Sequence, residues 1–139
     1  MKTAIVYRSF LGTTKTYARW LHEQLDSDLF GALTARRSRM AKYDLVALCS
    51  GTYAGWISIQ GRLKSWWKTL SGREIILLVV GMAPPEDPQS ERAYLKIPEH
   101  IRNGTKYFKV PGKFGPTDHE KVRKENLQPV LQYIRGLEG

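Results

Sequence analysis

The chain has 139 residues, of which 42% are hydrophobic and 25% are charged, and these proportions fit one compact domain over residues 1–139. The longest apolar run, Ile75 to Val80, is far shorter than the roughly 20 residues of a transmembrane helix, and the first residues lack the apolar segment of a signal peptide. We therefore expect no membrane span and a cytoplasmic location. Lysine and arginine outnumber aspartate and glutamate by 22 to 13, and the resulting net charge of +9 favours acidic partners.

The cysteine and histidine content argues against two classes of site. Cys49 is the one cysteine of the sequence, so no internal disulfide can form, and its apolar neighbours predict a buried thiol. His22, His100 and His119 are dispersed without the spacing of metal ligands, so we expect no metal site.

Residues 5–21 have the pattern of a buried strand, a polar turn and an amphipathic helix. Ala4 to Tyr7 is a short apolar run with β-branched residues, and a helical pattern extends to about Leu25. The turn between them, Ser9 to Thr14, contains three hydroxyl side chains and one glycine. A helix N-terminus offers unpaired N–H groups and a favourable dipole to an anion, and hydroxyls add donors. This turn therefore predicts a phosphate site, although it matches neither the dinucleotide fingerprint nor the Walker loop. The alternative is that a hydroxyl of this turn only caps the helix, but capping would need only one of the three hydroxyls.

Further apolar runs predict a sheet whose strands alternate with helices. The expected strands are Leu29–Leu33, Asp44–Cys49, Glu74–Val80 and Thr105–Val110, with the first and the last at sheet edges. The expected intervening segments are a loop or short helix over 34–42, a helix over 59–70 and a helical stretch over 90–102 that Pro98 divides.

The C-terminal segment predicts helix with two alternatives for its start. Thr117–Glu120 has a capping-box pattern. Pro129 either kinks the terminal helix or lies in the first turn of a second one capped by Asn126.

Two more loops follow central strands and could complete a ligand site. Ser50–Trp56 contains two glycines and two aromatic residues, Tyr53 and Trp56, which either stack on a planar ligand or pack on the protein itself. Gly81–Pro85 follows the most apolar strand. Alternating strands and helices predict a parallel α/β sheet, and ligands bind at the carboxyl edge of such sheets.

The first turn and its flanks resemble the flavodoxin family. Every constrained position of that family's signature is matched, by Ile5, Val6, Tyr7, Ser9, Gly12, Thr14, Ala18 and Leu21. The resemblance implies a three-layer, doubly wound α/β fold with a five-stranded parallel sheet in the order 2-1-3-4-5, which places the three loops on one edge. It also implies FMN as the cofactor, with its phosphate in the first loop and its isoalloxazine beside the second and third.

The cofactor-binding residues that this resemblance implies lie in the three loops. They are Ser9, Phe10, Leu11, Gly12, Thr13 and Thr14, then Gly51, Thr52, Tyr53, Ala54, Gly55 and Trp56, then Gly81, Met82 and Ala83. No set of catalytic side chains is visible near these loops, which suits a redox protein whose flavin carries the chemistry.

Three functions remain open from the sequence. The first is an FMN electron carrier between redox partner proteins. The second is an FMN-dependent oxidoreductase acting on a quinone or porphyrinogen: Tyr53–Gly55 and Lys113–Gly115 are distantly similar to the protoporphyrinogen oxidase branch, although the chain has no room for the long insertion of that branch. The third is a flavin-less module whose basic surface binds a polyanion; we rank nucleic acid last as a partner, because edge-strand alternation explains Lys106–Lys109 equally well.

Overall fold

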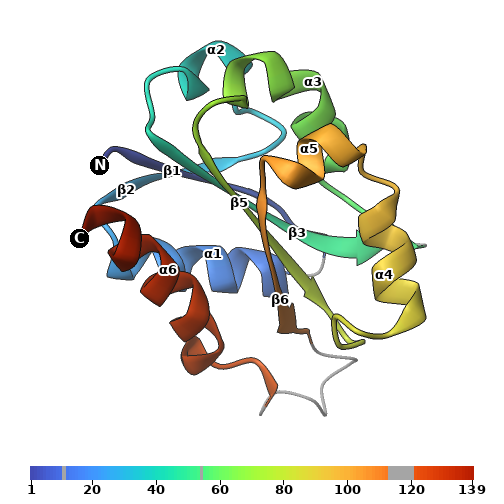
Figure 1. Cartoon of the computed structure of the whole chain (residues 1–139). Coiled ribbons are helices and arrows are strands. Elements are labelled where there is room, and N and C mark those ends of the chain that lie inside the picture. The colour runs from blue at the N-terminus through green and yellow to red at the C-terminus, as the bar shows by residue number, and fades with distance from the viewer. Residues whose placement is uncertain (11, 54, 113–120) are drawn as a thin grey trace.

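A parallel sheet lies between two layers of helices (Figure 1) in the computed structural model, which describes residues 1–10, 12–53, 55–112 and 121–139. Five parallel strands lie in the order β2-β1-β3-β5-β6. Their bounds are Thr3–Arg8 (β1), Ser27–Gly31 (β2), Leu45–Tyr53 (β3), Glu74–Gly81 (β5) and Lys106–Pro111 (β6). Counted as parallel strands, this is the expected order 2-1-3-4-5, so the predicted α/β fold is confirmed.

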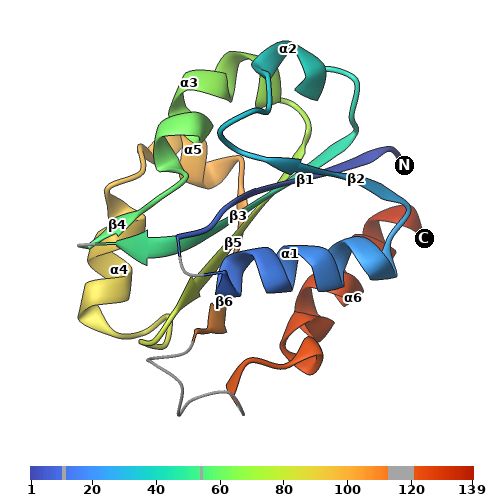
Figure 2. The ribbon, with the colours of Figure 1, turned by 180° about the vertical axis from the view of Figure 1, so that it is seen from behind.

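Helices cover both faces of the sheet, as the front and back views show (Figures 1 and 2). One face carries α1 (Thr13–Gln24) and α6 (Gln128–Glu138). The other carries α2 (Arg37–Met40), α3 (Gln60–Leu70), α4 (Pro88–Leu95) and α5 (Glu99–Asn103). Within the described ranges, no helix has the length and apolar character needed to cross a bilayer.

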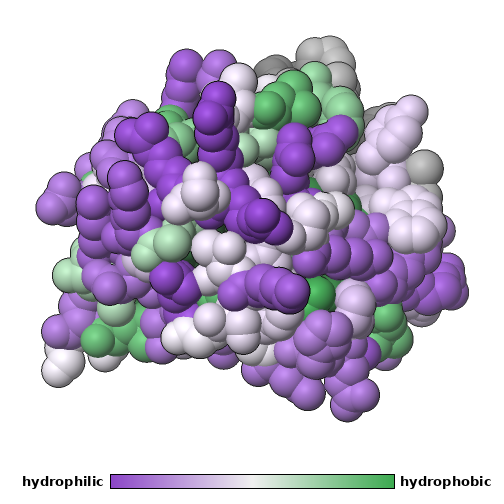
Figure 3. Space-filling model, turned by 90° about the horizontal axis from the view of Figure 1, so that it is seen from above, coloured by the Kyte–Doolittle hydropathy of each residue, from purple (hydrophilic) through white to green (hydrophobic). Residues whose placement is uncertain are grey.

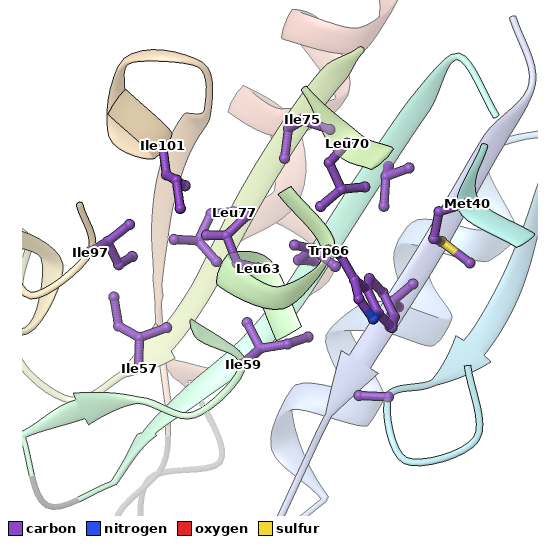
Figure 4. Packing of buried hydrophobic residues seen from close by; sticks show 14 of the residues in the cluster. Met40, Ile57, Ile59, Leu63, Trp66, Leu70, Ile75, Leu77, Ile97 and Ile101 are labelled. Atoms are coloured by element: carbon purple, nitrogen blue, oxygen red, sulfur yellow. The ribbon is translucent and has the colours of Figure 1, made fainter. Parts of the chain in front are cut away.

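Each face of the sheet has its own apolar core, and the strand register aligns the residues of each. Val6, Leu48 and Leu77 lie side by side on the α3 face. Ile5, Ala47 and Ile76 form the matching row on the α1 face. Figure 4 shows the first core from close by: Leu63 and Leu70 of α3 lie near Leu77 and Ile75 of β5, and the Trp66 ring reaches toward Met40. Cys49 is fully buried on β3, as the sequence predicted, and burial raises the pKa of its thiol to about 12.

The second loop differs from the expectation, because β3 does not end at Cys49. It continues to Tyr53 and turns back through Gly55, at φ 79°, into the short antiparallel strand β4 (Trp56–Ile57). The N–H and hydroxyl of Ser58 both donate to the Gly51 carbonyl, at 2.9 Å each. The loop is therefore a hairpin that holds Thr52 and Tyr53 in extended backbone.

Three other predicted boundaries can be compared with the structure. The expected strand Leu29–Leu33 lies two residues earlier, because Gly31 accepts bonds from the N–H groups of Thr34 and Ala35 and starts a turn. Pro98 does divide the helical stretch, since it precedes α5. Pro129 lies in the first turn of α6, as one alternative predicted.

The prediction that Asn126 caps the terminal helix is wrong. Its amide donates to Tyr17 Oη at 3.0 Å and to the Lys121 carbonyl at 2.7 Å, while Leu127 occupies the cap position of α6 after a 3₁₀ turn (η3, Lys124–Leu127). The capping-box pattern at 117–120 lies outside the described residues.

Arg73 joins three segments on the α3 side through its guanidinium. Its nitrogens donate to the carbonyls of Tyr43 (3.1 Å), Ala41 (2.9 Å) and Thr69. Thr69 lies in the last turn of α3, where carbonyls lack helical partners and a cation is favourable. Arg73 therefore stabilises the end of α3 and the chain between α2 and β3.

We expect Arg73→Ala to lower the free energy of unfolding by about 2 kcal/mol, because several charge-assisted bonds to carbonyls are lost. Arg73→Lys should recover less than half of this, because an ammonium cannot reproduce the planar fork. The control is Lys68→Ala, which removes the same charge from an exposed position and should change stability by less than about 0.5 kcal/mol. Urea unfolding measures all three; equal losses at both positions would contradict the role of Arg73.

Candidate cofactor site at the carboxyl edge of the sheet

The turn between β1 and α1 has the geometry of an anion site. Gly12 precedes the first turn of α1 with φ 88°, a left-handed backbone that a residue with a Cβ adopts only with strain. Its N–H donates to Ser9 Oγ at 3.0 Å, and its carbonyl accepts from the N–H and the hydroxyl of Thr16, each at 3.0 Å. The N-cap residue is Gly12 itself, and no side-chain cap bond is present among the described residues of this turn. The N–H groups of the first helical turn, from Thr13 onward, therefore stay available to a ligand.

The three predicted loops meet around a hollow of about 450 Å³, a size typical of small-molecule sites. Its lining residues are Ser9, Phe10, Thr13, Thr14, Gly51, Thr52, Tyr53, Val80, Gly81, Met82 and Gly112. They come from the ends of β1, β3, β5 and β6 and from the start of α1. None of these side chains carries a charge, so backbone dipoles and hydroxyls provide the polarity of the hollow.

One glycine allows close approach of the chain segments here. A Cβ at Gly51 would lie 3.5 Å from Thr14 Oγ1, which is an ordinary van der Waals distance. A Cβ at Gly81 would lie 3.0 Å from Lys109 Cε and 3.1 Å from Thr52 Oγ1, closer than side chains normally pack. A side chain at Gly81 would therefore displace Lys109 or Thr52, whereas Gly51 has room for a Cβ.

The rim of the hollow is apolar and exposed. Phe10 is 61% exposed, Tyr53 69% and Met82 47%. The rings of Phe10 and Tyr53 face each other with centroids 5.6 Å apart. Large apolar side chains gathered at the mouth of a pocket are typical of a ligand or partner contact.

Lys109 on β6 lies beside this hollow. It lines an adjoining hollow of about 200 Å³ together with Thr52 and Met82, which belong to both. Its Nζ donates to Ser90 Oγ at 2.5 Å. Burial lowers the pKa of Lys109, while the Asp87 carboxylate partly offsets this effect. A partly desolvated cation therefore stands at the edge of an uncharged pocket.

The structure brings together most of the residues that the sequence singled out. Nine line the 450 Å³ hollow: Ser9, Phe10, Thr13, Thr14, Gly51, Thr52, Tyr53, Gly81 and Met82. Gly12 lies in the adjoining turn, Gly55 and Ala83 line the 200 Å³ hollow, and Trp56 lines a further hollow on the α3 side of Tyr53. Leu11, Ala54 and Lys113–Gly115 lie outside the described residues.

Sequence reasoning missed Val80, Gly112 and Lys109. Val80 and Gly112 were treated as parts of a strand and its end. Lys109 lies in the alternating strand TKYFKV. A basic residue between the apolar residues Phe108 and Val110 is the one signal that this side chain could have a particular role. The pattern alone does not tell which sheet face or which end it occupies.

Comparisons with known proteins agree with this architecture. The family model of the flavodoxin domain matches residues 4–127, whereas a search of curated proteins finds no match. Among solved structures, the Trp repressor binding protein from Bacillus subtilis is similar with a TM-score of 0.64 and 14% identity, over 90% of this chain and 96% of that one. Oxidised flavodoxin 2 from Bacillus cereus is similar with a TM-score of 0.63 and 18% identity, over 97% and 99%.

An FMN-dependent NADH-azoreductase from Bacillus anthracis, solved in complex with FMN, is similar with a TM-score of 0.58 and 12% identity, over 100% of both chains. At these identities the structural likeness shows the fold alone. The family model spans nearly the whole sheet and the turn at Gly12, and on this match the chain belongs to the flavodoxin family.

Proposed function

We propose that this protein binds FMN in the 450 Å³ hollow and carries electrons between redox partner proteins. The observation that carries the proposal is the uncapped start of α1, with Ser9, Thr13 and Thr14 beside it, opening onto a hollow between strand ends. Membership of the flavodoxin family and the FMN complex of the azoreductase neighbour support the choice of cofactor.

The residues present fit the two ends of FMN. The phosphate would be held by the N–H groups of the first turn of α1 and by the hydroxyls of Ser9, Thr13 and Thr14, since neutral donors and a helix dipole suit a dianion. The ring would be held near Gly51 and Gly81, which line the hollow without a side chain of their own. Phe10 and Tyr53 offer aromatic faces at the rim.

The lining supports electron transfer more than catalysis by side chains. Bound FMN supplies reversible uptake of one or two electrons. The described residues that line the 450 Å³ hollow contain no acid, base or nucleophile beyond hydroxyl groups, so they bind, orient and exclude water. The exposed rim would give a partner protein access to the edge of the site, and the net charge of +9 supports an acidic partner.

An FMN-dependent oxidoreductase acting on a small molecule such as a quinone is the second candidate. A further hollow of about 540 Å³ adjoins the first and shares Phe10 and Tyr53 with it, which leaves room for a substrate. Turnover of a soluble quinone with a chemical reductant distinguishes the electron carrier from the oxidoreductase. An electron carrier turns over quinones slowly, because its substrates are partner proteins. An oxidoreductase shows a rate that saturates with quinone concentration.

The proposal predicts that the purified protein retains FMN after removal of the excess, measured by its visible absorbance. Thr14→Val keeps the buried shape of this side chain and removes its hydroxyl, so we expect FMN affinity to fall about ten- to a hundredfold. The control is Ser65→Ala, an exposed hydroxyl on α3 that should leave affinity unchanged. No retained flavin in the wild type would overturn the proposal and favour a flavin-less basic module.

Lys109 should raise the reduction potential of bound FMN, because added electrons are stabilised by a nearby cation. We expect Lys109→Met to make the potential more negative by tens of millivolts, the effect of one charge at an effective dielectric constant near 20. As pH rises through the lowered pKa of Lys109, the wild type loses this charge, so the difference between the two proteins should shrink at high pH. Redox titration across pH measures both effects.

The control for Lys109 is Lys106→Met on the same strand. Lys106 lies over the rings of Phe108 and Tyr133, 5.8 Å and 5.4 Å from their centroids, on the side of α6. The Lys106→Met substitution removes the same charge at a position away from the hollow, and it should shift the reduction potential of FMN much less. Equal shifts from both variants would mean that total charge, and not the position of Lys109, sets the potential.

A further inference from the structure

Lys109 is the one charged residue among the described residues that line the 450 Å³ hollow and the adjoining 200 Å³ hollow. Thr52 and Met82 belong to both hollows and so lie between them. Lys109 lies on β6 and is half-buried. Lysine side chains usually keep their ammonium group in water, so this position must be maintained by specific contacts.

The stem of the Lys109 side chain passes closely over Gly81 of β5. A Cβ at Gly81 would lie 3.0 Å from Lys109 Cε, 3.3 Å from Lys109 Nζ and 3.1 Å from Thr52 Oγ1. The lysine stem therefore occupies space that any other residue at position 81 would fill. Because Gly81 also lines the 450 Å³ hollow, this path brings the ammonium group beside the wall of that hollow.

Ser90 of α4 holds the end of the lysine side chain. Lys109 Nζ donates to Ser90 Oγ at 2.5 Å. Ser90 is only 4% exposed, and its hydroxyl donates to the carbonyl of Ala83 at 3.4 Å. The acceptor of the ammonium group is thus a buried hydroxyl that is itself bonded to the third loop.

The charge of Lys109 has no direct counter-ion. Within the described ranges, no carboxylate forms an ion pair with Lys109, and Asp87, which caps α4, acts on it only through longer-range attraction. The other described residues that line the 200 Å³ hollow, from β3, α4 and the third loop, are uncharged. A partly buried cation beside a neutral acceptor costs free energy, because the lost water is only partly replaced. This arrangement favours a role for the charge itself over a role in packing.

Most of the net charge of the chain lies elsewhere. Residues 29–73 contain eight basic residues and one acidic residue, so this segment accounts for seven of the nine net positive charges. The eight basic residues belong to α2, α3 and the turns beside these helices, and hydrophilic side chains cover much of this face in the view from above (Figure 3). Water and salt screen exposed charges, whereas a partly buried charge acts more strongly on its surroundings. The position of Lys109 therefore matters more than its share of the total charge.

We propose that Ser90 is a positioning residue that fixes the ammonium group of Lys109 at the wall of the cofactor hollow, so that this charge acts on bound FMN. The effect on FMN rests on the proposed function. Ser90 does not line the 450 Å³ hollow, so its influence passes through Lys109. Without the hydroxyl of Ser90, the flexible lysine stem turns its charge toward water, where the charge is screened.

The first test needs no FMN. Nitrogen NMR of protein with labelled lysines follows the protonation of each Nζ, and Lys109→Met identifies the signal of Lys109. Burial lowers the pKa of Lys109 in the wild type. In Ser90→Ala we expect this pKa to rise toward the ordinary value of lysine, because the released ammonium group returns to water. The signal of Lys106, which lies on the side of α6, should be the same in both proteins.

A pKa of Lys109 that stays unchanged or falls further in Ser90→Ala would overturn the proposal. Loss of an acceptor disfavours the charged form of a lysine that remains buried, so either result would mean that other contacts hold Lys109 in place.

The second test is a double-mutant cycle on the reduction potential of bound FMN. We expect Ser90→Ala to make the potential more negative by about half or more of the shift that Lys109→Met produces. In the Lys109→Met background, Ser90→Ala should add almost nothing, because its effect depends on the lysine. Shifts that add independently would overturn the proposal, since Ser90 would then act on the cofactor by another route.

A conservative variant and a remote variant complete the cycle. Ser90→Thr keeps the hydroxyl and should keep both the potential and the pKa of Lys109 close to those of the wild type. Ser65→Ala removes an exposed hydroxyl of α3 and should change neither. Shifts in Ser90→Thr as large as those in Ser90→Ala, at an equal melting temperature, would contradict a role of the hydroxyl. If the added methyl group lowers the melting temperature, the double-mutant cycle still decides.

Failure of this inference and failure of the proposed function give different results. If the protein retains no FMN, the proposed function fails, while the NMR titration still decides whether Ser90 positions Lys109. If FMN is retained but Ser90→Ala changes neither the pKa of Lys109 nor the potential, this inference alone fails.

Discussion

The left-handed backbone at Gly12 is the constraint on which the site depends. The chain leaves β1 at Arg8 and enters α1 at Thr13, and this short reversal needs one residue at φ 88°. The reversal sets the N-terminus of α1 at the carboxyl end of a central strand. α1 is then fixed by burial of Tyr17, whose hydroxyl donates to the Pro111 carbonyl at 2.6 Å and accepts from Asn126. One buried side chain thus connects α1, and with it the β1–α1 turn, to the end of the last strand.

The parts of the fold that the sequence predicts well are those in which local pattern and tertiary environment agree. Ile75–Val80 of β5 is a continuous apolar run, and it is buried on both faces of the sheet because helices cover both faces. The turn from Ser9 to Thr14 was also visible, since hydroxyls, a glycine and a following helical pattern all indicate one geometry. Pro98 acts through its own ring and therefore needs no distant partner to break a helix.

The parts that could not be predicted depend on distant partners. Gly51 and Thr52 have the composition of a loop, and only pairing with the two-residue strand β4 makes them a strand. Asparagine is a good capping residue by type, yet the side-chain amide of Asn126 donates to the hydroxyl of Tyr17, which lies 109 positions earlier in the chain. The surroundings of Lys109 and Ser90 depend on which helix covers which strand end, and a pattern over neighbouring residues does not contain that information.

Cys49 gives the sheet a built-in reporter of its own opening. It is the one cysteine of the chain, it lies on β3 between β1 and β5, and its exposed fraction is 0%. A thiol reagent can reach it only when the central strands separate, because the thiolate that reacts is suppressed by burial in the closed state. The rate of labelling therefore measures the opening free energy of the central sheet, much as amide exchange does, but at a single known atom.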